Sequence, residues 1–367
     1  MMAQPLLCEV LIDPERAKGL NLQQWDLLIR QARHADLLAR LAYLLEGQSG
    51  VPTAAQRHLD SARTFAQRQA QSVRYEVASI QKALSDLGIP VVLLKGAAYI
   101  MAGLPAAPGR LLSDIDILVP KLSMEQVENG LLLYGWRTTH HDEYDQTYYR
   151  QWMHEIPPMK HGVRGTVIDV HHAILPPTAR LKPDSSKMLA AAVALAAEPG
   201  VCVFSPVDMV LHSATHLFHE GELEHGLRDL VDLDALLRHF GEQSGFWEQL
   251  VERAVALDLV RPLYYALRYT AQMVATPIPP FVVKALDKLG RPPALISSLM
   301  DVLFARALRP SHVSCDSQWT ALARWMLYIR SHYLRMPFRL LFPHLIRKAV
   351  KKRQGSGSLT EPVVVKE

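Results

Sequence analysis

Two aspartates stand two residues apart inside an apolar run, Leu112-Ser113-Asp114-Ile115-Asp116-Ile117-Leu118-Val119. Alternate residues of a β-strand point to the same face of a sheet, so we expect Asp114 and Asp116 side by side while Ile115 and Ile117 face a core. Adjacent carboxylates repel each other and lose hydration on burial, and a bound cation is the usual reason for such a pair. The run therefore predicts a strand that carries a divalent-metal site for phosphoryl chemistry.

A second apolar run precedes this strand and ends in a strand-to-helix turn. Residues 90–96 predict a strand, 97–102 a short helix, and the Pro/Gly/Ala-rich segment 103–109 a loop. At the turn, Lys95, Gly96 and Ala97 would present backbone N–H groups and a helix N-terminus to a triphosphate. Beyond the Asp-x-Asp strand, Ser123 is the expected N-cap of a helix over 124–134. This alternation of strand and helix favours an α/β core.

A third aspartate follows on a predicted hairpin. Residues 154–161 and 166–172 read as strands joined by the turn 162–165, which has glycine at both ends. Asp169 and His171 share one face of the second strand. If the strands are neighbours, Asp114, Asp116 and Asp169 converge on one or two Mg²⁺ (or Mn²⁺) ions. Alternatively Asp169 pairs with Arg164, and His171 is a partner of Asp169 or an acceptor-site residue.

The rest of the chain reads as helical. We expect an α+β fold, in which a core of mixed strands is embedded in helical N- and C-terminal regions. The predicted boundaries are an N-terminal helical region 1–88, a core 89–178, a C-terminal helical region 179–321, a basic and aromatic helical tail 322–353 and a disordered end 354–367.

Composition excludes several classes of protein. The 367 residues are 49% hydrophobic, which predicts a folded globular chain. A net charge of +4 does not indicate nucleic acid. The three cysteines are widely separated, and we find neither a signal peptide nor an apolar run of roughly 20 residues, so we expect a cytoplasmic protein.

The ordered set of motifs resembles a known family. It is similar to the bacterial uncharacterised nucleotidyltransferase family, within the DNA polymerase β-type nucleotidyltransferase superfamily, over roughly residues 85–240. The motifs that carry the resemblance are Leu94-Lys95-Gly96, Arg110 with Ser113-Asp114-Ile115-Asp116, Gly135-Trp136, Ile168-Asp169-Val170-His171 and the later His-rich helix.

The resemblance implies transfer of an NMP group from an NTP to an acceptor, which could be a small molecule, a glycan precursor or a protein. Asp114 and Asp116 would ligate the metal, and Asp169 would be the third carboxylate. The implied nucleotide-binding residues are Lys95, Gly96, Ala97, Arg110 and Ser113. The superfamily usually has Gly-Ser or Gly-Gly where this chain has Gly96-Ala97, and its glycine lies closer to the Asp-x-Asp pair. The alternative is a catalytically impaired binding or regulatory protein, in a surface-polysaccharide or toxin–antitoxin context.

Four features remain open from the residues alone. Arg110 could contact phosphate or anchor its loop to an acid, while Arg228, Asp229 and Asp232 could form a polar network or line the cleft. His212, His216 and His219 form a helical stripe that more often makes hydrogen bonds than binds zinc. The tail 322–353 is expected to be a core helix with a solvated end; an interfacial helix on anionic lipid and a nucleic-acid-binding segment are the alternatives.

Overall fold

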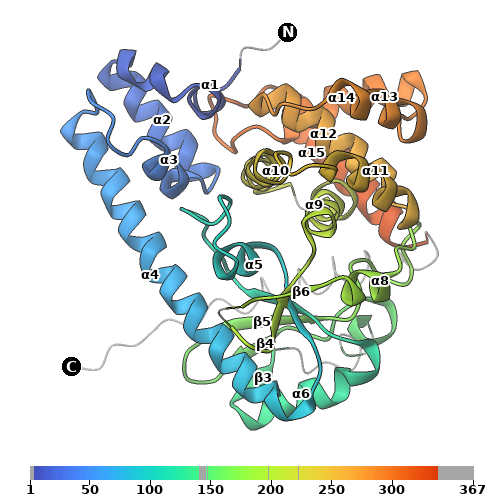
Figure 1. The fold of residues 1–367 in the computed structure, drawn as a ribbon. Coiled ribbons are helices and arrows are strands. Elements are labelled where there is room, and N and C mark those ends of the chain that lie inside the picture. The colour runs from blue at the N-terminus through green and yellow to red at the C-terminus, as the bar shows by residue number, and fades with distance from the viewer. Residues whose placement is uncertain (1–3, 140–145, 147, 197, 222, 338–367) are drawn as a thin grey trace, which may run out of the picture.

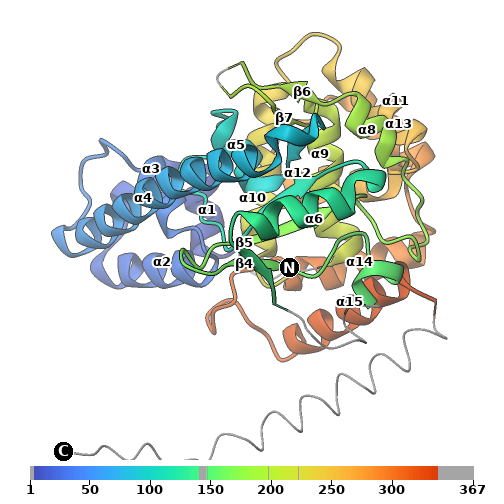
Figure 2. The same ribbon diagram turned by 90° about the horizontal axis from the view of Figure 1, so that it is seen from below.

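A long helix, a mixed sheet and a cluster of C-terminal helices make up the computed structural model, which describes residues 4–139, 146, 148–196, 198–221 and 223–337 (Figure 1). The long helix α4 (Thr53–Leu84) runs along one side of the molecule. Its buried side chains include Val73, Val77 and Ile80, at the spacing of one helical face. Seen from below, α4 and α6 (Met124–Leu133) lie side by side (Figure 2).

The sheet has seven strands in the described part of the chain, in the order β3-β4-β5-β2-β1-β7-β6. Their bounds are β1 Val91–Leu93, β2 Ile115–Leu118, β3 Trp136–Thr138, β4 Met159–His161, β5 Val167–His171, β6 Val193–Ala194 and β7 Val201–Val203. β1 is antiparallel to β2, with Val92 opposite Leu118, whereas β2 and β5 are parallel. All residues of β1 and β2 are buried, as expected for central strands covered on both faces.

The structure corrects the sequence-based expectation at several places. β1 ends at Leu93 and α5 (Lys95–Met101) begins two residues later, so Lys95 and Gly96 belong to the helix and not to the predicted strand 90–96. A helical pattern was expected beyond residue 186, yet β6 and β7 lie there, and β7 pairs in parallel with β1. The sheet therefore continues past the predicted core boundary at 178. Within 154–161 only β4 is a strand, because Glu155 makes just an isolated bridge to His171. Ser123 precedes α6 but its side chain makes no capping hydrogen bond.

The helices frame the sheet and agree with the predicted α+β class. In the N-terminal half they are α1 Leu6–Ile12, α2 Leu22–His34, α3 Leu38–Leu44, α4, α5 Lys95–Met101 and α6. In the C-terminal half they are α8 Ser185–Ala190, α9 Pro206–Thr215, α10 Gly226–Phe240, α11 Phe246–Ala256, α12 Val260–Val274, α13 Pro280–Leu289, α14 Ala294–Ala307 and α15 Thr320–Arg335. Shorter turns are η1 Pro14–Gly19, η2 Ser85–Leu87, η3 Lys121–Ser123, η4 Tyr148–Trp152 and η5 His216–Glu220.

The helices of the described ranges are too short or too polar to cross a bilayer. α15 covers the first part of the predicted tail and buries one face through Ala323, Leu327 and Ser331. The rest of the tail and the predicted disordered end lie outside the described residues. The domain division remains a prediction.

Candidate active site

Two aspartates face each other across neighbouring strands. β2 and β5 run parallel in a register that places Asp116 opposite Asp169. Opposite residues of adjacent strands point to the same side of the sheet, so both carboxylates emerge on one face. Asp116 is 5% exposed, and Asp169 is half-buried. The strand pairing thus brings together two of the three predicted metal ligands.

Asp116 is held by two cationic side chains. Lys95 Nζ and His171 Nε2 each lie 3.1 Å from its Oδ1 atom. Burial opposes ionisation, but Lys95 and His171 outweigh it and hold the pKa of Asp116 well below its usual range. His171 Nδ1 lies 3.2 Å from Glu155 Oε2. Burial alone would lower the pKa of His171, but Asp116 and Glu155 raise it to about 9, so this histidine is an imidazolium that orients Asp116.

Asp169 lacks such support. Its Oδ1 atom is buried and has no hydrogen-bond partner among the residues that the structure describes. Burial, and next the charge of Asp116, raise the pKa of Asp169 to about 7. Arg164, which the sequence offered as an alternative partner, instead binds Glu76 with distances of 2.5 and 2.9 Å. An unpartnered carboxylate oxygen beside a second carboxylate fits a hard divalent cation such as Mg²⁺ or Mn²⁺.

Asp114 lies just outside the strand on which it was expected. β2 begins at Ile115, so Asp114 belongs to the end of the preceding loop and is half-buried. Ser113 is exposed, and its Oγ donates a hydrogen bond of 3.0 Å to Asp114 Oδ1. The aspartates that lie opposite each other on the sheet are therefore Asp116 and Asp169. Asp114 directly precedes the N-terminal end of β2. The charge of Asp114 contributes to raising the pKa of Asp169.

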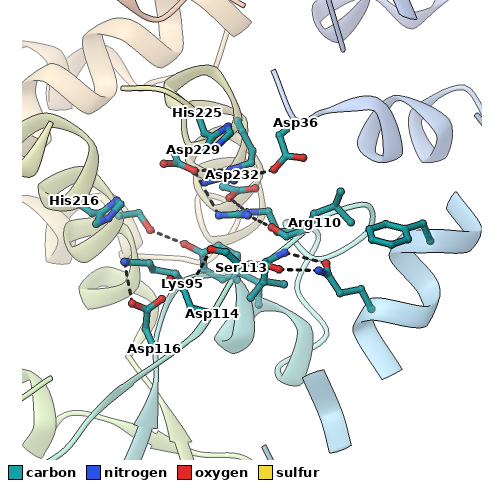
Figure 3. A pocket seen from close by; sticks show the side chains of 18 residues that line it. Asp36, Lys95, Arg110, Ser113, Asp114, Asp116, His216, His225, Asp229 and Asp232 are labelled. Carbon is teal, nitrogen blue, oxygen red and sulfur yellow. Dashed lines mark hydrogen bonds and ion pairs between the residues drawn. The ribbon is translucent and has the colours of Figure 1, made fainter. Parts of the chain in front are cut away.

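A cavity of about 380 Å³ lies at the N-terminal end of β2 (Figure 3). Its walls come from α4, α5, the loop before β2, α9 and α10. Six of the predicted site residues line it, namely Lys95, Gly96, Arg110, Ser113, Asp114 and Asp116. Ala97 does not line it and is 1% exposed in the core, and Asp169 lies beyond its lining. The hydroxyl that Ala97 lacks would thus sit in the core in this arrangement.

The turn from β1 into α5 is unusual in its backbone. Lys95 has φ +48°, in the left-handed region of backbone conformation that residues other than glycine rarely adopt. Gly96 is needed for a close approach, since a Cβ there would lie 2.8 Å from Leu112 Cδ2. The turn and the loop before β2 therefore pack directly on each other.

That loop is clamped by long-range hydrogen bonds. Gln69 of α4 donates from Nε2 to the carbonyl of Leu112 (2.7 Å) and accepts from its N–H (2.9 Å). Arg40 donates to the carbonyls of Pro105 (2.6 Å) and Ala106 (3.0 Å). Gly109 has φ +76°, and a Cβ there would lie 2.4 Å from Arg40 N. These contacts fix the segment that ends in Ser113 and Asp114.

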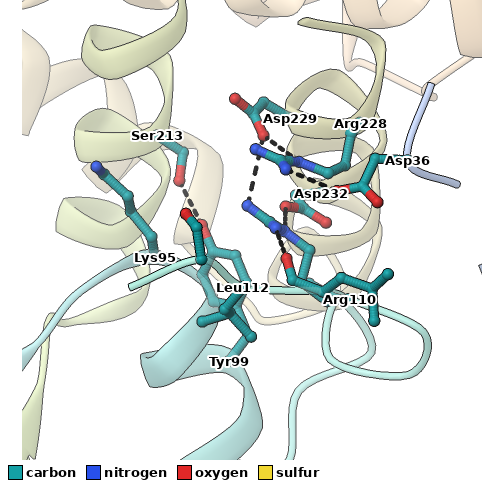
Figure 4. Close-up of polar contacts among 12 residues, drawn as sticks. Asp36, Lys95, Tyr99, Arg110, Leu112, Ser213, Arg228, Asp229 and Asp232 are labelled. Atoms are coloured by element: carbon teal, nitrogen blue, oxygen red, sulfur yellow. Dashed lines mark hydrogen bonds and ion pairs between the residues drawn. The ribbon is translucent and has the colours of Figure 1, made fainter. Parts of the chain in front are cut away.

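Arg110 anchors the loop to α10 in a buried charged network (Figure 4). Its Nε lies 2.6 Å from Asp232 Oδ2, and its second amino group lies 3.5 Å from Asp229. Arg228 contacts Asp229 and Asp36, each at 2.9 Å. Burial would lower the pKa of Arg110, but Asp232 and Asp229 raise it. The network joins the N-terminal helices, the loop and α10, and it also lines the cavity.

The three predicted stripe histidines do not act together. His212 and His216 lie toward the site; burial, and next the charge of Lys95, lower the pKa of His212 to about 3 and that of His216 well below its usual value. His219 lies toward Arg330 and Arg335, because the π-helical turn η5 takes more residues per revolution than an α turn. In the described ranges, the ligand atoms of His154, Glu155 and His171 lie within 4.8 Å of one another and could hold an ion. Since His171 already bridges Asp116 and Glu155, we assign it to orienting Asp116.

Several site residues had no signal in the sequence. Gln69, Glu155 and Asp36 come from elements far from the Asp-x-Asp run, and no spacing rule links them to it. Tyr99 and Ser213, which line the cavity and share a hydrogen bond of 2.6 Å, are a further example. Among the partners of Asp116 and its neighbours, His171 is the one that the sequence could suggest, because it lies on the same strand as Asp169.

Comparison with known protein families gives the class to which the chain belongs. The family model described as uncharacterised nucleotidyltransferase matches residues 21–275, well over half of the chain, and the chain belongs to that family. The match extends beyond the expected 85–240 to include α2, α3 and α4 on one side and α11 and α12 on the other. No curated protein and no solved structure matches the chain.

Proposed function

We propose that the chain transfers an NMP group from an NTP to an acceptor hydroxyl or phosphate with a divalent ion, Mg²⁺ or Mn²⁺. The observation that carries this proposal is the buried Oδ1 of Asp169, which lies beside Asp116 and has no hydrogen-bond partner in the described part of the chain. Burying a carboxylate without a partner costs on the order of several kcal/mol, which a bound cation removes. Family membership supports nucleotidyl transfer; the metal, the NTP donor and the acceptor belong to the proposal.

Each carboxylate has a distinct place in the proposed site. Asp116, Asp169 and Asp114 would hold the ion, which when bound would neutralise triphosphate charge and stabilise the leaving pyrophosphate. Glu155 and His171 keep Asp116 ionised and oriented. Asp169 would also accept the proton of an acceptor hydroxyl; its pKa of about 7 belongs to the chain without an ion, and a bound cation would lower it.

The cavity would receive the nucleotide. Lys95 lines it at the β1–α5 turn, within reach of Asp116, and would contact a phosphate oxygen as well. Gly96 allows the side chain of Leu112 to pack against the β1–α5 turn, and this contact helps to hold Ser113 and Asp114 at the N-terminal end of β2. Arg110 acts mainly by anchoring the loop to α10, since its side chain is 9% exposed and paired with two aspartates.

A nucleotide-binding protein that no longer catalyses transfer is the second candidate. One observation favours it: the charge of Asp116 is already neutralised by Lys95 and His171. Such a protein would bind an NTP in the cavity and leave it intact.

Label transfer separates the two candidates. The purified protein is incubated with each α-labelled NTP and Mg²⁺ or Mn²⁺, with and without cell extract as a source of acceptor. We expect transfer by the natural chain, a loss of about 100-fold or more in Asp116→Asn and Asp169→Asn, and no change in Asp287→Asn, an exposed carboxylate on α13. Equal transfer by Asp116→Asn would contradict the site. NTP binding by calorimetry without any transfer would favour the second candidate.

A further inference from the structure

One face of α15 presents large apolar side chains to solvent. Trp325 is 59% exposed, Leu322 and Tyr328 are each 43% exposed, and Ile329 is 40% exposed. At 100° per residue these four positions occupy about a third of the helix circumference, centred on Trp325. The sequence places no Asp, Glu, Lys or Arg within that arc. A surface helix usually presents its polar face to solvent, whereas α15 presents this apolar stripe.

The stripe is fixed to the body of the protein. Arg330 donates a hydrogen bond of 2.8 Å to the carbonyl of Phe218 and stacks its guanidinium over Tyr265 and Phe304. At the C-terminal end of α15, the Thr178 hydroxyl donates to the carbonyl of Arg335 (2.8 Å). α14 packs along α15. The apolar stripe therefore belongs to a firmly seated helix and has a defined orientation relative to the sheet.

The sequence that follows α15 indicates what covers the stripe. Residues 338–353 lie outside the described part of the chain, and they include six Lys or Arg residues and no Asp or Glu. Positive charge therefore follows directly after an exposed stripe that contains Trp and Tyr, the residues favoured where an apolar layer meets water. A second copy of the chain would bring two such basic segments together, which disfavours self-association. An anionic lipid surface satisfies both the apolar stripe and the positive charge.

We propose that the α15 stripe, Leu322, Trp325, Tyr328 and Ile329, docks on anionic membranes. The excess of Lys and Arg in the sequence that follows α15 favours anionic over neutral lipid. The helix lies in the plane of the interface and does not cross the bilayer, in keeping with its length of 16 residues. The proposal does not depend on the proposed function.

Vesicle co-sedimentation of the full-length protein tests this surface. We expect binding to vesicles of phosphatidylcholine with roughly 30% phosphatidylglycerol to exceed binding to phosphatidylcholine alone by about ten-fold, and to fall with added salt. The variant Trp325→Ser/Ile329→Ser should lower binding about five-fold or more. Lys348→Glu/Lys351→Glu/Lys352→Glu should also lower it. The control Leu133→Ser, which changes an 86% exposed side chain on α6, should bind as the natural chain does.

Thermal melting of each variant checks that folding is retained, as expected for changes at exposed positions. Absence of binding to the anionic vesicles overturns the proposal. It is also overturned if Trp325→Ser/Ile329→Ser binds as well as the natural chain, since the stripe then takes no part. A dimer in light scattering that Trp325→Ser/Ile329→Ser dissociates would instead assign the stripe to a second copy.

Discussion

Asp169 lies directly opposite Asp116 on the parallel strands β5 and β2, and the two carboxylates are unequally supported. Lys95 and His171 both contact one oxygen of Asp116, each at 3.1 Å, whereas Asp169 Oδ1 is buried and finds no hydrogen-bond partner within the described ranges. One carboxylate is therefore stabilised as an anion by the protein itself. The other has its pKa raised to about 7, and the proposed cation would stabilise its ionised form.

The substitution Asp169→Asn is expected to stabilise the metal-free protein at pH 8. The pKa of Asp169 is raised from 3.8 to about 7 in the folded chain, so this group lowers stability progressively as the pH rises from about 4 to about 7, and the full cost is present above pH 7. The gain from Asp169→Asn should be on the order of 1–3 kcal/mol at pH 8 and should fade as the pH drops toward 4. Urea unfolding with a chelator at both pH values measures it, and a loss of stability at pH 8 would argue against the strained carboxylate.

Added Mg²⁺ or Mn²⁺ should stabilise the natural chain against heat. A cation that binds the folded state alone raises the melting temperature, by an amount that grows with ion concentration. The shift should disappear with excess EDTA, in Asp116→Asn and in Asp169→Asn, and should persist in the exposed control Asp287→Asn. A shift of equal size in Asp169→Asn would show that the ion binds elsewhere, for example at His154, Glu155 and His171.

Lys95→Met should impair both the nucleotide site and the fold. The substitution removes one of two cations from buried Asp116, which costs about 1–3 kcal/mol of unfolding free energy without metal. If Lys95 also contacts phosphate, KM for the NTP rises at least about ten-fold. Lys95→Arg keeps the charge and should retain more of both properties. Unchanged stability and unchanged KM in Lys95→Met would remove Lys95 from the site.

Parts of the site follow from local patterns. The alternation of Asp116 with Ile115 and Ile117 predicts the strand and its buried face, and the glycines of the turn 162–165 predict the hairpin that carries Asp169. The α+β class follows from the same periodicities. The boundary that separates Asp114 from β2 cannot be predicted from these patterns, because the ends of a strand depend on the pairing partner as well as on the residues themselves.

The remaining site residues depend on long-range packing. The placement of β2 beside β5, which brings Asp116 to Asp169 and His171, joins residues more than 50 positions apart. Gln69 reaches Leu112 from α4, and Asp232 reaches Arg110 from α10. No spacing rule connects such pairs, since only the tertiary fold sets their distances. β6 and β7 were missed for a related reason, because strands of two and three residues carry too little periodicity.

Gln69→Ala should loosen the loop that holds Asp114. It leaves both the N–H and the carbonyl of Leu112 without their present partner, at a cost of about 1–3 kcal/mol. Because Ser113 and Asp114 follow at once, kcat/KM should fall by more than the stability loss alone explains. Hydrogen exchange should increase at 110–114, while Gln67→Ala, an exposed glutamine on the same helix, should leave both measurements unchanged. Unaltered exchange in Gln69→Ala would count against the clamp.

His219→Leu should protect the protein against acid. His219 is 2% exposed, and neither ring nitrogen has a hydrogen-bond partner among the described residues. Burial, and next the charge of Arg330, lower its pKa to about 3. Below pH 6.5, the histidine of the unfolded chain binds a proton, whereas the buried histidine of the folded chain stays neutral down to about pH 3. The free energy of unfolding therefore falls as the pH drops between these two values, by up to about 1.4 kcal/mol per pH unit.

Leucine at this position removes the proton-binding group and keeps the apolar volume. The free energy of unfolding of His219→Leu should therefore match or exceed that of the natural chain at pH 7, and exceed it by roughly 2–3 kcal/mol at pH 4.5. Urea titrations at the two pH values test this, with the exposed His239→Leu as the control that should follow the natural chain. Parallel pH dependence of the natural chain and His219→Leu would show that His219 accepts a proton while the protein stays folded.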